Sequence, residues 1–394
     1  MILRAGSLKS GELEGLKFIV AGGGFYGSVM AERIASDMGE RVVVVEKRTH
    51  VGGNSYSEKD PETGIERHKY GSHIFHTGNA KVWEYVNRFC RFNGYRHRVA
   101  AAYKGRLYPW PIDLDTINGF YGTNMSAAEA ERFLRAEGAV GDIPAPRNLE
   151  EQAVSMMGRR LYEVFVEGYT SKQWDRHPAD LPPDAIKRLP VRFSRSAGYF
   201  SDKWQGVPEE GYGELFRNML SHPKIQVYPG TDFFEIRELI PASCRIIYTG
   251  PVDEYFGYMF GRLGWRSLVF EEQVIAAENF QGMAVVNYPE ISVPFTRIHE
   301  FRHLHAGTPA PAGKTLIARE YPADRAAGRE PLYPVNAAAD KEIYARYSVR
   351  GRLESGTIFG GRLGGYRYLD MDQAVAEALE TYELRIRKAD RAYG

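Results

Sequence analysis

The alternation of apolar and polar positions is most regular in the first sixty residues. Residues 17–21 form a short apolar run of the kind that makes a buried parallel strand. Residues 28–35 contain good helix formers with apolar side chains at helical spacing, and residues 41–46 form a second apolar run. The pattern therefore predicts a strand, a helix and a second buried strand in direct succession.

Further along the chain the pattern changes twice. Residues 79–193 are mostly helical by their apolar spacing, and helices are expected over 80–92, 127–137 and 149–168. Short β-like runs then alternate with turns from 225 to 293, and residues 314–319 predict another strand. An amphipathic helix is expected from Asp370 to about 387. This order fits a domain built from the two chain ends, with insertions between them.

A glycine-rich turn lies between the first strand and helix. Gly22-Gly23-Gly24-Phe25-Tyr26-Gly27 fits G-x-G-x-x-G, and Glu46 ends the second strand 24 residues after Gly22. Glycines let the backbone approach a pyrophosphate, whose charge is met by helix N-terminal amides, and the acid accepts hydrogen bonds from a ribose. The alternative is a simple glycine turn with a solvated Glu46. The combination favours a dinucleotide-binding fold.

Two further glycine segments indicate which dinucleotide is bound. Gly52-Gly53-Asn54, just past the ribose acid, is similar to the FAD-binding extension of the amine-oxidase-like flavoproteins. Residues 359–364 are rich in glycine and precede the Asp370 helix, whose N-terminus offers a second place to neutralise flavin or phosphate oxygens. FAD is therefore the expected cofactor.

Composition narrows the class of protein. The chain has 51 basic and 50 acidic side chains, which argues against a nucleic-acid partner. Arginine (37) far exceeds lysine (14), which fits either an anionic ligand or a codon preference. Cys90 and Cys244 are the only cysteines, so a disulfide framework and a cysteine zinc site are excluded. No apolar run approaches a membrane span and no secretory leader is visible, so a cytoplasmic protein is expected.

One motif is misleading. His299-Glu300-Phe301-Arg302-His303 matches H-E-x-x-H, in which two histidines share a helix face and hold zinc. Pro294 and Pro309 leave little room for a helix here. No metal is therefore expected.

The residues that follow the cofactor motif resemble one family in order along the chain. The segment Tyr70-Gly71-Ser72-His73-Ile74-Phe75-His76-Thr77 resembles the histidine loop of bacterial UDP-galactopyranose mutases. The matching segments cover nearly the whole chain from residue 17 to 389, and the others are 165–174, 187–192, 198–202, 287–288, 296–300, 318–322, 332–335 and 361–372.

This resemblance implies an α/β fold with a Rossmann-like FAD-binding domain, an inserted helical domain and a twisted antiparallel sheet domain. The expected domains are 1–78 with 205–250 and 335–394 for FAD, 79–193 for the helices, and 194–204 with 251–334 for the sheet. The implied reaction interconverts UDP-galactopyranose and UDP-galactofuranose through an adduct between flavin N5 and the sugar, without net redox change. FAD is active only when reduced, so a reductant such as NAD(P)H is a possible partner, and a homodimer is expected.

The resemblance also implies roles for single residues. Arg188 and Arg297 clamp the diphosphate as negative charge develops on it, and His73 and His76 lie near the isoalloxazine. The substrate-binding residues are Phe165, Tyr169, Thr170, Trp174, Tyr199, Asn287, Tyr333, Tyr368 and Asp370. The cofactor-binding residues are Gly22, Gly24, Phe25, Gly27, Glu46, Lys47, Gly53, Asn54, His73, Arg362 and Met371.

Several positions depart from the family pattern. Gly23 and Tyr26 lie in the cofactor loop where other small residues are usual, Ser72 replaces a frequent proline, and Val166 replaces a common aromatic residue. With these departures, the resemblance does not determine which nucleotide sugar is the substrate. The alternatives are a mutase for a related nucleotide sugar and an amine-oxidase-like FAD oxidoreductase.

Overall fold

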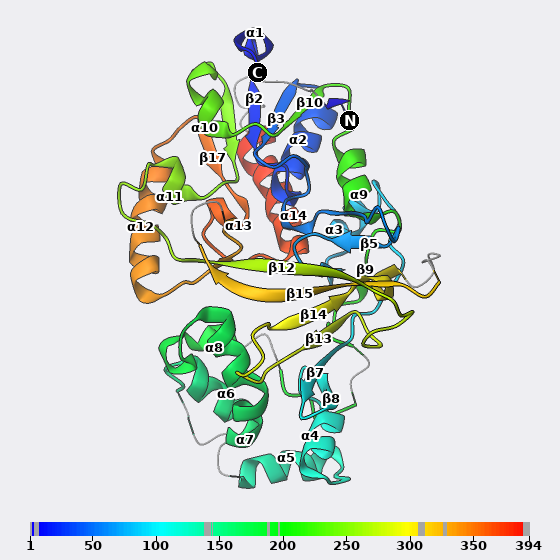
Figure 1. The fold of residues 1–394 in the computed structure, drawn as a ribbon. Helices are drawn as coiled ribbons and strands as arrows, with labels where there is room; N and C mark the ends of the chain where they lie inside the picture. The colour runs from blue at the N-terminus through cyan, green and yellow to red at the C-terminus, as the bar shows by residue number, and fades with distance from the viewer. Residues whose placement is uncertain are drawn as a thin grey trace.

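The computed structural model describes residues 2–3, 8–137, 143, 145–186, 190–195, 198–305, 312–325 and 329–388. Figure 1 shows three layers along the long axis: a parallel sheet with its helices at one end, a broad sheet across the middle, and a group of helices at the other end. Within these residue ranges, no helix is both long and apolar enough to cross a lipid bilayer.

The apolar runs predicted near the N-terminus are neighbouring strands in a six-stranded parallel sheet. β2 (Phe18–Ala21) and β3 (Val42–Glu46) are buried along their whole length, as expected for strands covered on both faces. Beside them lie strands from distant segments, β10 (Ile225–Pro229) next to β3 and β11 (Arg245–Tyr248) next to β2. The outer strands are β1 (Ile2–Leu3), which pairs with β10, and β17 (Thr357–Phe359), which pairs with β11. The order is β1-β10-β3-β2-β11-β17, which confirms that this Rossmann-like domain is assembled from discontinuous segments.

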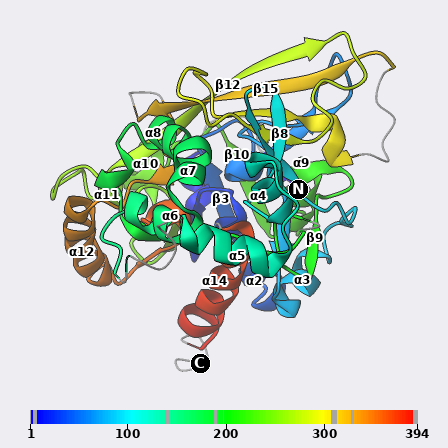
Figure 2. The same cartoon turned by 90° about the horizontal axis from the view of Figure 1, so that it is seen from below.

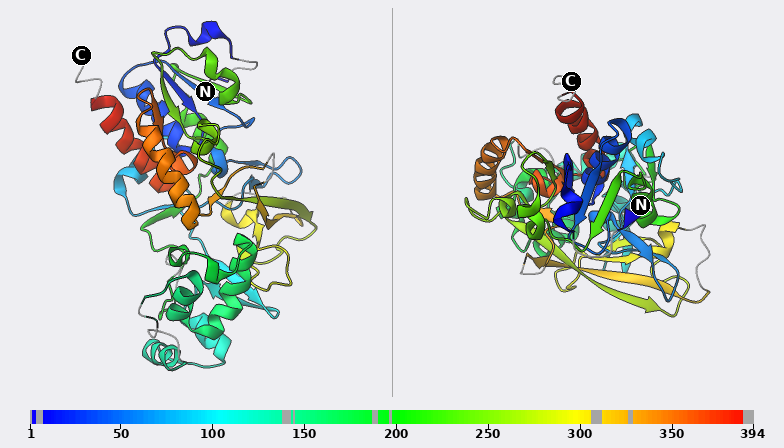
Figure 3. Two further views of the ribbon diagram at one scale, coloured as in Figure 1. Left: turned by 90° about the vertical axis from the view of Figure 1, so that its left-hand side faces the viewer. Right: turned by 90° about the horizontal axis from the view of Figure 1, so that it is seen from above.

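The helix predicted after β2 is α2 (Phe25–Asp37), and the late amphipathic helix is α14 (Met371–Thr381). They pack against one another through buried side chains that include Met30 and Val375. The longer helix α12 (Ala338–Arg352) lies at the surface of the same half of the molecule (Figure 3). The other helices of this part are α1 (Ser10–Leu13), α9 (Gly211–Met219), α10 (Phe233–Ile236), α11 (Val252–Tyr255) and α13 (Gly361–Gly364).

The middle layer is a seven-stranded sheet that is antiparallel except where β13 meets β7. In spatial order its strands are β16 (Tyr333–Pro334), β12 (Trp265–Ile275), β15 (Thr315–Asp324), β14 (Arg297–Glu300), β13 (Val285–Asn287), β7 (Val99–Tyr103) and β8 (Arg106–Trp110). The strand predicted over 314–319 is the first half of β15. Two small two-stranded sheets pair β4 (Ser57–Lys59) with β5 (Glu66–His68), and β6 (Phe75–Thr77) with β9 (Trp204–Gly206).

Residues 79–110 differ from the helical prediction. α3 (Ala80–Val86) is shorter than expected, and its buried side chains pack into the core of the parallel-sheet domain. β7 and β8 then form a hairpin, because Lys104 and Gly105 both adopt positive φ (47° and 74°), which is the geometry of a tight two-residue turn. The side chains of α3 thus belong to the core of the parallel-sheet domain, whereas Ala101 and Tyr108 of the hairpin pack in one core with the helices that follow. The three-domain division stays a proposal.

The helical unit lies below the middle sheet in Figure 1 and faces the viewer in Figure 2. It contains α4 (Leu114–Tyr121), α5 (Ala127–Ala136), α6 (Leu149–Met157), α7 (Arg159–Tyr162) and α8 (Gly168–Trp174). The helix expected over 149–168 is interrupted at Gly158, whose φ is 81°, and again by one π-helical turn at Glu163–Glu167. Such turns are frequent at functional sites, and this one presents α8 to the sheet.

Candidate functional site

The glycine loop forms one wall of a cavity of about 240 Å³. Gly22 adopts a φ of +110°, which favours glycine, and its N–H donates to the carbonyl of Val45 at 2.8 Å. A Cβ on Gly27 would lie 2.0 Å from the carbonyl oxygen of Gly22. The turn therefore requires glycine at both positions, and α2 begins immediately beside the cavity.

Glu46 lies at the end of β3, where the sequence pattern expects the ribose acid. Its carboxylate accepts hydrogen bonds from the N–H groups of Gly23 (2.8 Å) and Arg48 (2.9 Å). Burial raises the pKa of Glu46, and the two backbone donors oppose this effect. The neighbouring Lys47 forms an exposed ion pair with Asp232 at 3.0 Å. The carboxylate is thus fixed in orientation at the cavity wall.

The second glycine pair closes the same wall. A Cβ on Gly53 would lie 3.2 Å from Cα of Gly24, so the two loops form a narrow cradle that a side chain would fill. Asn54 accepts a hydrogen bond from Arg48 at 2.9 Å, and the Arg48 guanidinium lies 4.3 Å from the ring centre of Tyr70. Nη1 of Arg48 is buried and has no hydrogen-bond partner among the residues that the structure describes. The sequence interpretation missed Arg48, although it directly follows the Glu46-Lys47 pair.

The chain end supplies the opposite wall. Arg362 on α13 is held by the carbonyls of Leu332 (3.2 Å) and Leu369 (2.6 Å). Asp370 caps α14, and Met371 is its first residue. Every residue that the sequence suggested for the cofactor lines this one cavity. Their shared location supports their proposed role.

The two predicted histidines lie in different surroundings. Nδ1 of His73 lies 2.7 Å from the carbonyl of Gly71, so it donates and leaves Nε2 as an acceptor. Burial lowers the pKa of His73 to about 4, and the ring is therefore neutral at pH 7. His76 does not line the cavity: its Nδ1 lies 2.6 Å from Asp202 and its ring stacks on Phe200.

Arg297, at the start of β14, gathers several predicted substrate residues around it. Its Nε donates to Oδ1 of Asn287 at 3.2 Å, and the two residues face each other in register. The guanidinium lies 5.6 Å from the ring centre of Tyr169 on α8, and its Nη1 lies 3.7 Å from Oε2 of Glu320 on β15. The helical unit and the sheet therefore meet at this side chain.

Tyrosines surround the same guanidinium. Tyr199 and Tyr333 interact electrostatically with Arg297, and the buried hydroxyl of Tyr169 has no hydrogen-bond partner in the described part of the chain. Burial raises the pKa of Tyr333 to about 12 and raises that of Tyr169 as well, so both phenols stay protonated. These hydroxyls are available as donors to an anion. We call Arg297, Asn287, Tyr169, Tyr199 and Tyr333 the arginine cluster.

Arg362 connects this cluster to the cavity. Its guanidinium lies 4.7 Å from the ring centre of Tyr368 and 5.8 Å from that of Tyr333, and these two rings stack at 6.0 Å. A ligand in the cavity and an anion at the arginine cluster would therefore both lie near Arg362.

The remaining predicted substrate residues lie in different surroundings. Phe165 is 3 % exposed and packs among the aromatic rings of Tyr108 and Phe120, so it contributes to the core of the helical unit. Thr170 is buried on α8, and Trp174 is half-buried at the C-terminal end of that helix. Arg188 lies outside the described residues.

A buried hydrogen-bonded chain behind Arg297 was not expected from the sequence. Both the N–H (3.3 Å) and the hydroxyl (2.9 Å) of Ser72 contact Nδ1 of His299, and Nε2 of His299 donates to Glu320 at 3.1 Å. Burial tends to raise the pKa of Glu320. The charge of Arg297 and the hydrogen bond from His299 outweigh this effect and lower the pKa to about 2. Glu320 is therefore an anion that fixes the guanidinium.

The H-E-x-x-H segment does not form one helix. His299 and Glu300 belong to β14, whereas His303 lies in the short helix Phe301–His305. Adjacent strand residues point to opposite faces, so the zinc arrangement is not formed. Across the described ranges, no group of three His, Cys, Asp or Glu side chains could hold a metal ion.

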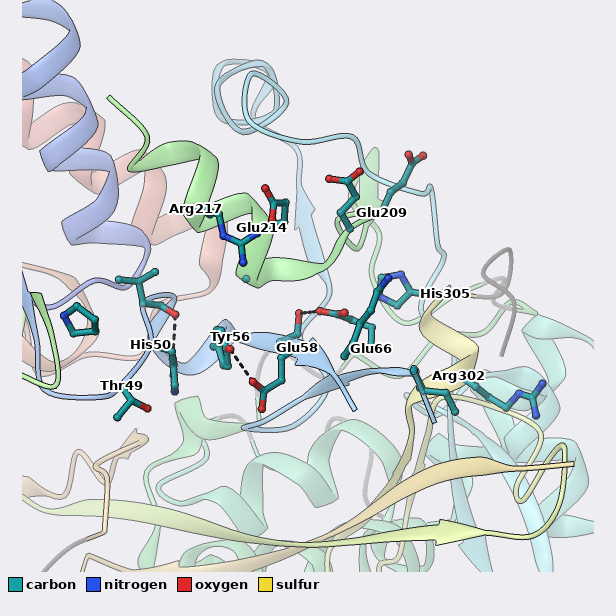
Figure 4. A pocket seen from close by; sticks show the side chains of 18 residues that line it. Thr49, His50, Tyr56, Glu58, Glu66, Glu209, Glu214, Arg217, Arg302 and His305 are labelled. Carbon is teal, nitrogen blue, oxygen red and sulfur yellow. Dashed lines mark hydrogen bonds and ion pairs between the residues drawn. The ribbon is translucent and has the colours of Figure 1, made fainter. Parts of the chain in front are cut away.

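A larger cavity of about 560 Å³ lies elsewhere (Figure 4). None of the predicted site residues lines it. Several glutamates line it, among them Glu58, Glu66 and Glu214. Their negative charge would repel a diphosphate. The smaller cavity and the adjoining arginine cluster are therefore the candidate site.

Comparison with known proteins gives consistent matches. The family model of UDP-galactopyranose mutases matches residues 164–368, and that of the NAD(P)-binding Rossmann-like domain matches residues 20–89. The chain is 40% identical over 371 residues to a probable UDP-galactopyranose mutase of Klebsiella pneumoniae, covering 92% of this chain and 93% of that protein. It is 37% identical over 378 residues to a dTDP-fucopyranose mutase of Escherichia coli, covering 94% and 98% respectively.

The fold is also similar to a solved structure. The crystal structure of reduced UDP-galactopyranose mutase matches with a TM-score of 0.71 and 15% identity, covering 94% of this chain and 95% of that chain. At this identity the match concerns the fold alone.

Proposed function

Because this chain belongs to the UDP-galactopyranose mutase family, we propose that it interconverts UDP-galactopyranose and UDP-galactofuranose with bound FAD. The observation that carries the proposal is that Arg297, Tyr169 and Tyr333 form one cluster, which Arg362 connects to the cavity that the glycine loop lines. A cationic side chain with several hydroxyl donors suits a nucleotide diphosphate, which leaves the sugar carbon and returns to it.

The cavity residues fit FAD. The cradle between Gly24 and Gly53 would be filled by any Cβ, and the buried Nη1 of Arg48 needs an acceptor. Glu46 is placed for the adenosine ribose, and the N-terminus of α2 for the pyrophosphate. When bound in its reduced form, FAD supplies the nucleophile and leaves the reaction without net redox change. Gly22, Phe25, Gly27, Lys47, Asn54, Arg362 and Met371 complete the proposed set of cofactor contacts.

The side chains of the arginine cluster hold the substrate in place next to the bound FAD. Arg297, with Arg188 as its proposed partner, binds the diphosphate and stabilises the charge that develops when the sugar carbon is released. The hydroxyls of Tyr199, Tyr333 and Tyr368 donate to phosphate oxygens, and Glu320 keeps the Arg297 guanidinium in place.

The histidines and the remaining substrate residues have supporting roles in this proposal. Neutral His73 offers Nε2 as an acceptor beside the isoalloxazine, and His76 orders the same loop through Asp202. Asn287 and Asp370 orient the arginine and tyrosine side chains. Thr170 and Trp174 on α8 contact the nucleoside, and Phe165 supports the helix that carries them.

The reduced state requires an electron donor, and we propose NAD(P)H for this role. We also propose that the enzyme is a cytoplasmic homodimer. No contact with nucleic acid is proposed, since the chain carries nearly equal numbers of basic and acidic side chains.

The direct test is to incubate dithionite-reduced enzyme with UDP-galactofuranose and to separate the products by chromatography. We expect UDP-galactopyranose to form with reduced enzyme and not with the oxidised control. Absence of the pyranose from a preparation that contains reduced flavin would overturn the proposal. A colourless preparation that takes up no flavin would overturn the cofactor assignment.

The sugar is a second question, because a relative that is 37% identical is a dTDP-fucopyranose mutase. The same assay with dTDP-fucofuranose in place of UDP-galactofuranose gives a ratio of kcat/KM values. A ratio that favours the thymidine nucleotide would assign this chain to the related nucleotide sugar instead.

A further inference from the structure

Lys172 on α8 has unusual partners. Its Nζ lies within hydrogen-bond distance of four backbone carbonyl oxygens: those of Tyr288 (2.6 Å), Glu290 (2.9 Å), Val293 (2.8 Å) and Phe295 (3.0 Å). An ammonium group has three N–H donors and no acceptor, so this half-buried side chain is fully engaged. All four carbonyls belong to one loop.

That loop, residues 288–296, connects β13 to β14. It is closed by a hydrogen bond from the N–H of Tyr288 to the carbonyl of Thr296 at 2.9 Å. Within it, the N–H of Val293 donates to the carbonyl of Glu290 at 3.1 Å. The inward carbonyls are satisfied by Lys172, so the lysine organises the loop from the helix side.

The loop ends are residues of the candidate site. Asn287 precedes the loop and Arg297 follows it, and these two are hydrogen-bonded to one another. On the other side, Lys172 lies one helical turn from Tyr169, whose ring lies beside Arg297. A single side chain thus connects the helix that carries Tyr169 with the loop that joins Asn287 to Arg297.

The close approach of helix and loop is visible at a second position. A Cβ built on Gly168, at the start of α8, would lie 2.4 Å from the carbonyl oxygen of Pro289 and 3.2 Å from the N–H nitrogen of Ile291. The helix can lie this close to the loop because residue 168 has no side chain. This contact is independent of the lysine.

We propose that Lys172 is a positioning residue for the substrate: it fastens the 288–296 loop to α8 and thereby sets the distance between Arg297 and Tyr169 that the diphosphate needs. The inference rests on the proposed function, since it concerns the same diphosphate site. Burial lowers the pKa of Lys172 to about 8, while Glu290 opposes the shift, so the side chain is an ammonium ion at pH 7.

The test uses the FAD-loaded, full-length Lys172→Met variant at pH 7. Methionine has a similar length but no donor, so the four carbonyls lose their partner. We expect amide exchange to accelerate in residues 288–296, UDP to bind at least tenfold more weakly by calorimetry, and KM for UDP-galactofuranose to rise by a similar factor. Flavin content and the flavin absorption spectrum should stay unchanged, because the cofactor cavity does not include the loop.

Gly168→Ala provides an independent perturbation that leaves the lysine intact. The new Cβ should push the loop away from α8 and produce the same combination of faster local exchange and weaker UDP binding. Gly356→Ala is the matched control, because a Cβ there meets nothing within 4 Å. It should behave as the wild type in all assays.

A purely structural role gives a different result. If Lys172→Met binds UDP within twofold of the wild type, or if exchange accelerates evenly over the whole chain, the positioning role is wrong. A wild-type enzyme that binds UDP but forms no pyranose would contradict the proposed reaction instead, and the comparison of variants would still decide the role of Lys172.

Discussion

Replacing Arg297 by lysine keeps the positive charge and removes the planar fork. In the structure the fork is used in three directions: toward Asn287, toward Glu320 and across the ring of Tyr169. A lysine ammonium is a compact point charge and cannot keep these contacts while also presenting two parallel donors to a diphosphate. The change therefore separates the geometry of the clamp from its charge.

The expected loss of activity follows from the number of hydrogen-bond donors that the substitution removes. Removing one donor from a site where negative charge develops costs about 2.7–4 kcal/mol, which corresponds to about 10²–10³-fold in kcat. Because lysine retains the charge, we expect the lower limit, a fall of about 100-fold in kcat/KM for Arg297→Lys. Glu320 should stay ionised, because the lysine remains within reach as a counter-ion.

The assay is the conversion of UDP-galactofuranose by the reduced variant, followed by chromatography of the nucleotide sugars. The matched control is Arg319→Lys, since Arg319 lies on the neighbouring strand but interacts with Gln273 and Glu271. Flavin content must equal that of the wild type in both variants. A value of kcat/KM within threefold of the wild type for Arg297→Lys would refute the clamp.

Three further changes have defined outcomes. Gly27→Ala should lower the flavin-to-protein absorbance ratio, because the added Cβ would lie 2.0 Å from the carbonyl oxygen of Gly22, whereas a normal ratio would contradict the tight-turn argument. Tyr333→Phe should raise KM for the nucleotide sugar about tenfold by removing a donor to an anion, and an unchanged KM would exclude that contact. Burial lowers the pKa of His97 from 6.5 to about 3, so its neutral form favours the folded state and stability falls as the pH drops below 6.5. Between pH 6.5 and 5.0 the free energy of unfolding, measured in urea, should fall by about 2 kcal/mol from this group alone. The fall in His97→Gln should be smaller by about that amount, and an equal fall in both proteins would contradict the assignment.

The cofactor half of the site was predictable from local sequence. Its residues follow one another within a strand-turn-helix-strand unit, and each has a physical requirement that a residue type reveals. Gly22 needs positive φ, Gly27 needs a missing side chain, and Glu46 must end a buried strand. The 104–105 turn carried a similar signal: a lysine-glycine pair between apolar runs is compatible with a hairpin, and the helical interpretation of this stretch overlooked it.

The substrate half could not be predicted from spacing. Arg297 is held by Asn287 across one strand pair and by Glu320 across the next, and strand register determines both pairings. Resemblance to a family identified the arginine, the asparagine and the tyrosines one by one. It did not reveal Glu320 or His299, because a buried acid inside an apolar strand is visible as a partner only when the neighbouring strand is known.

Substitutions should also affect the cofactor half and the substrate half of the site differently. The glycine turn is stabilised by backbone geometry within a few residues, so a substitution there acts directly on the cofactor. The arginine cluster depends on contacts between elements, from Ser72 through His299 and Glu320 on one side and from Lys172 on the other. Substitutions at these connecting residues should therefore weaken binding of the nucleotide diphosphate while leaving flavin content intact.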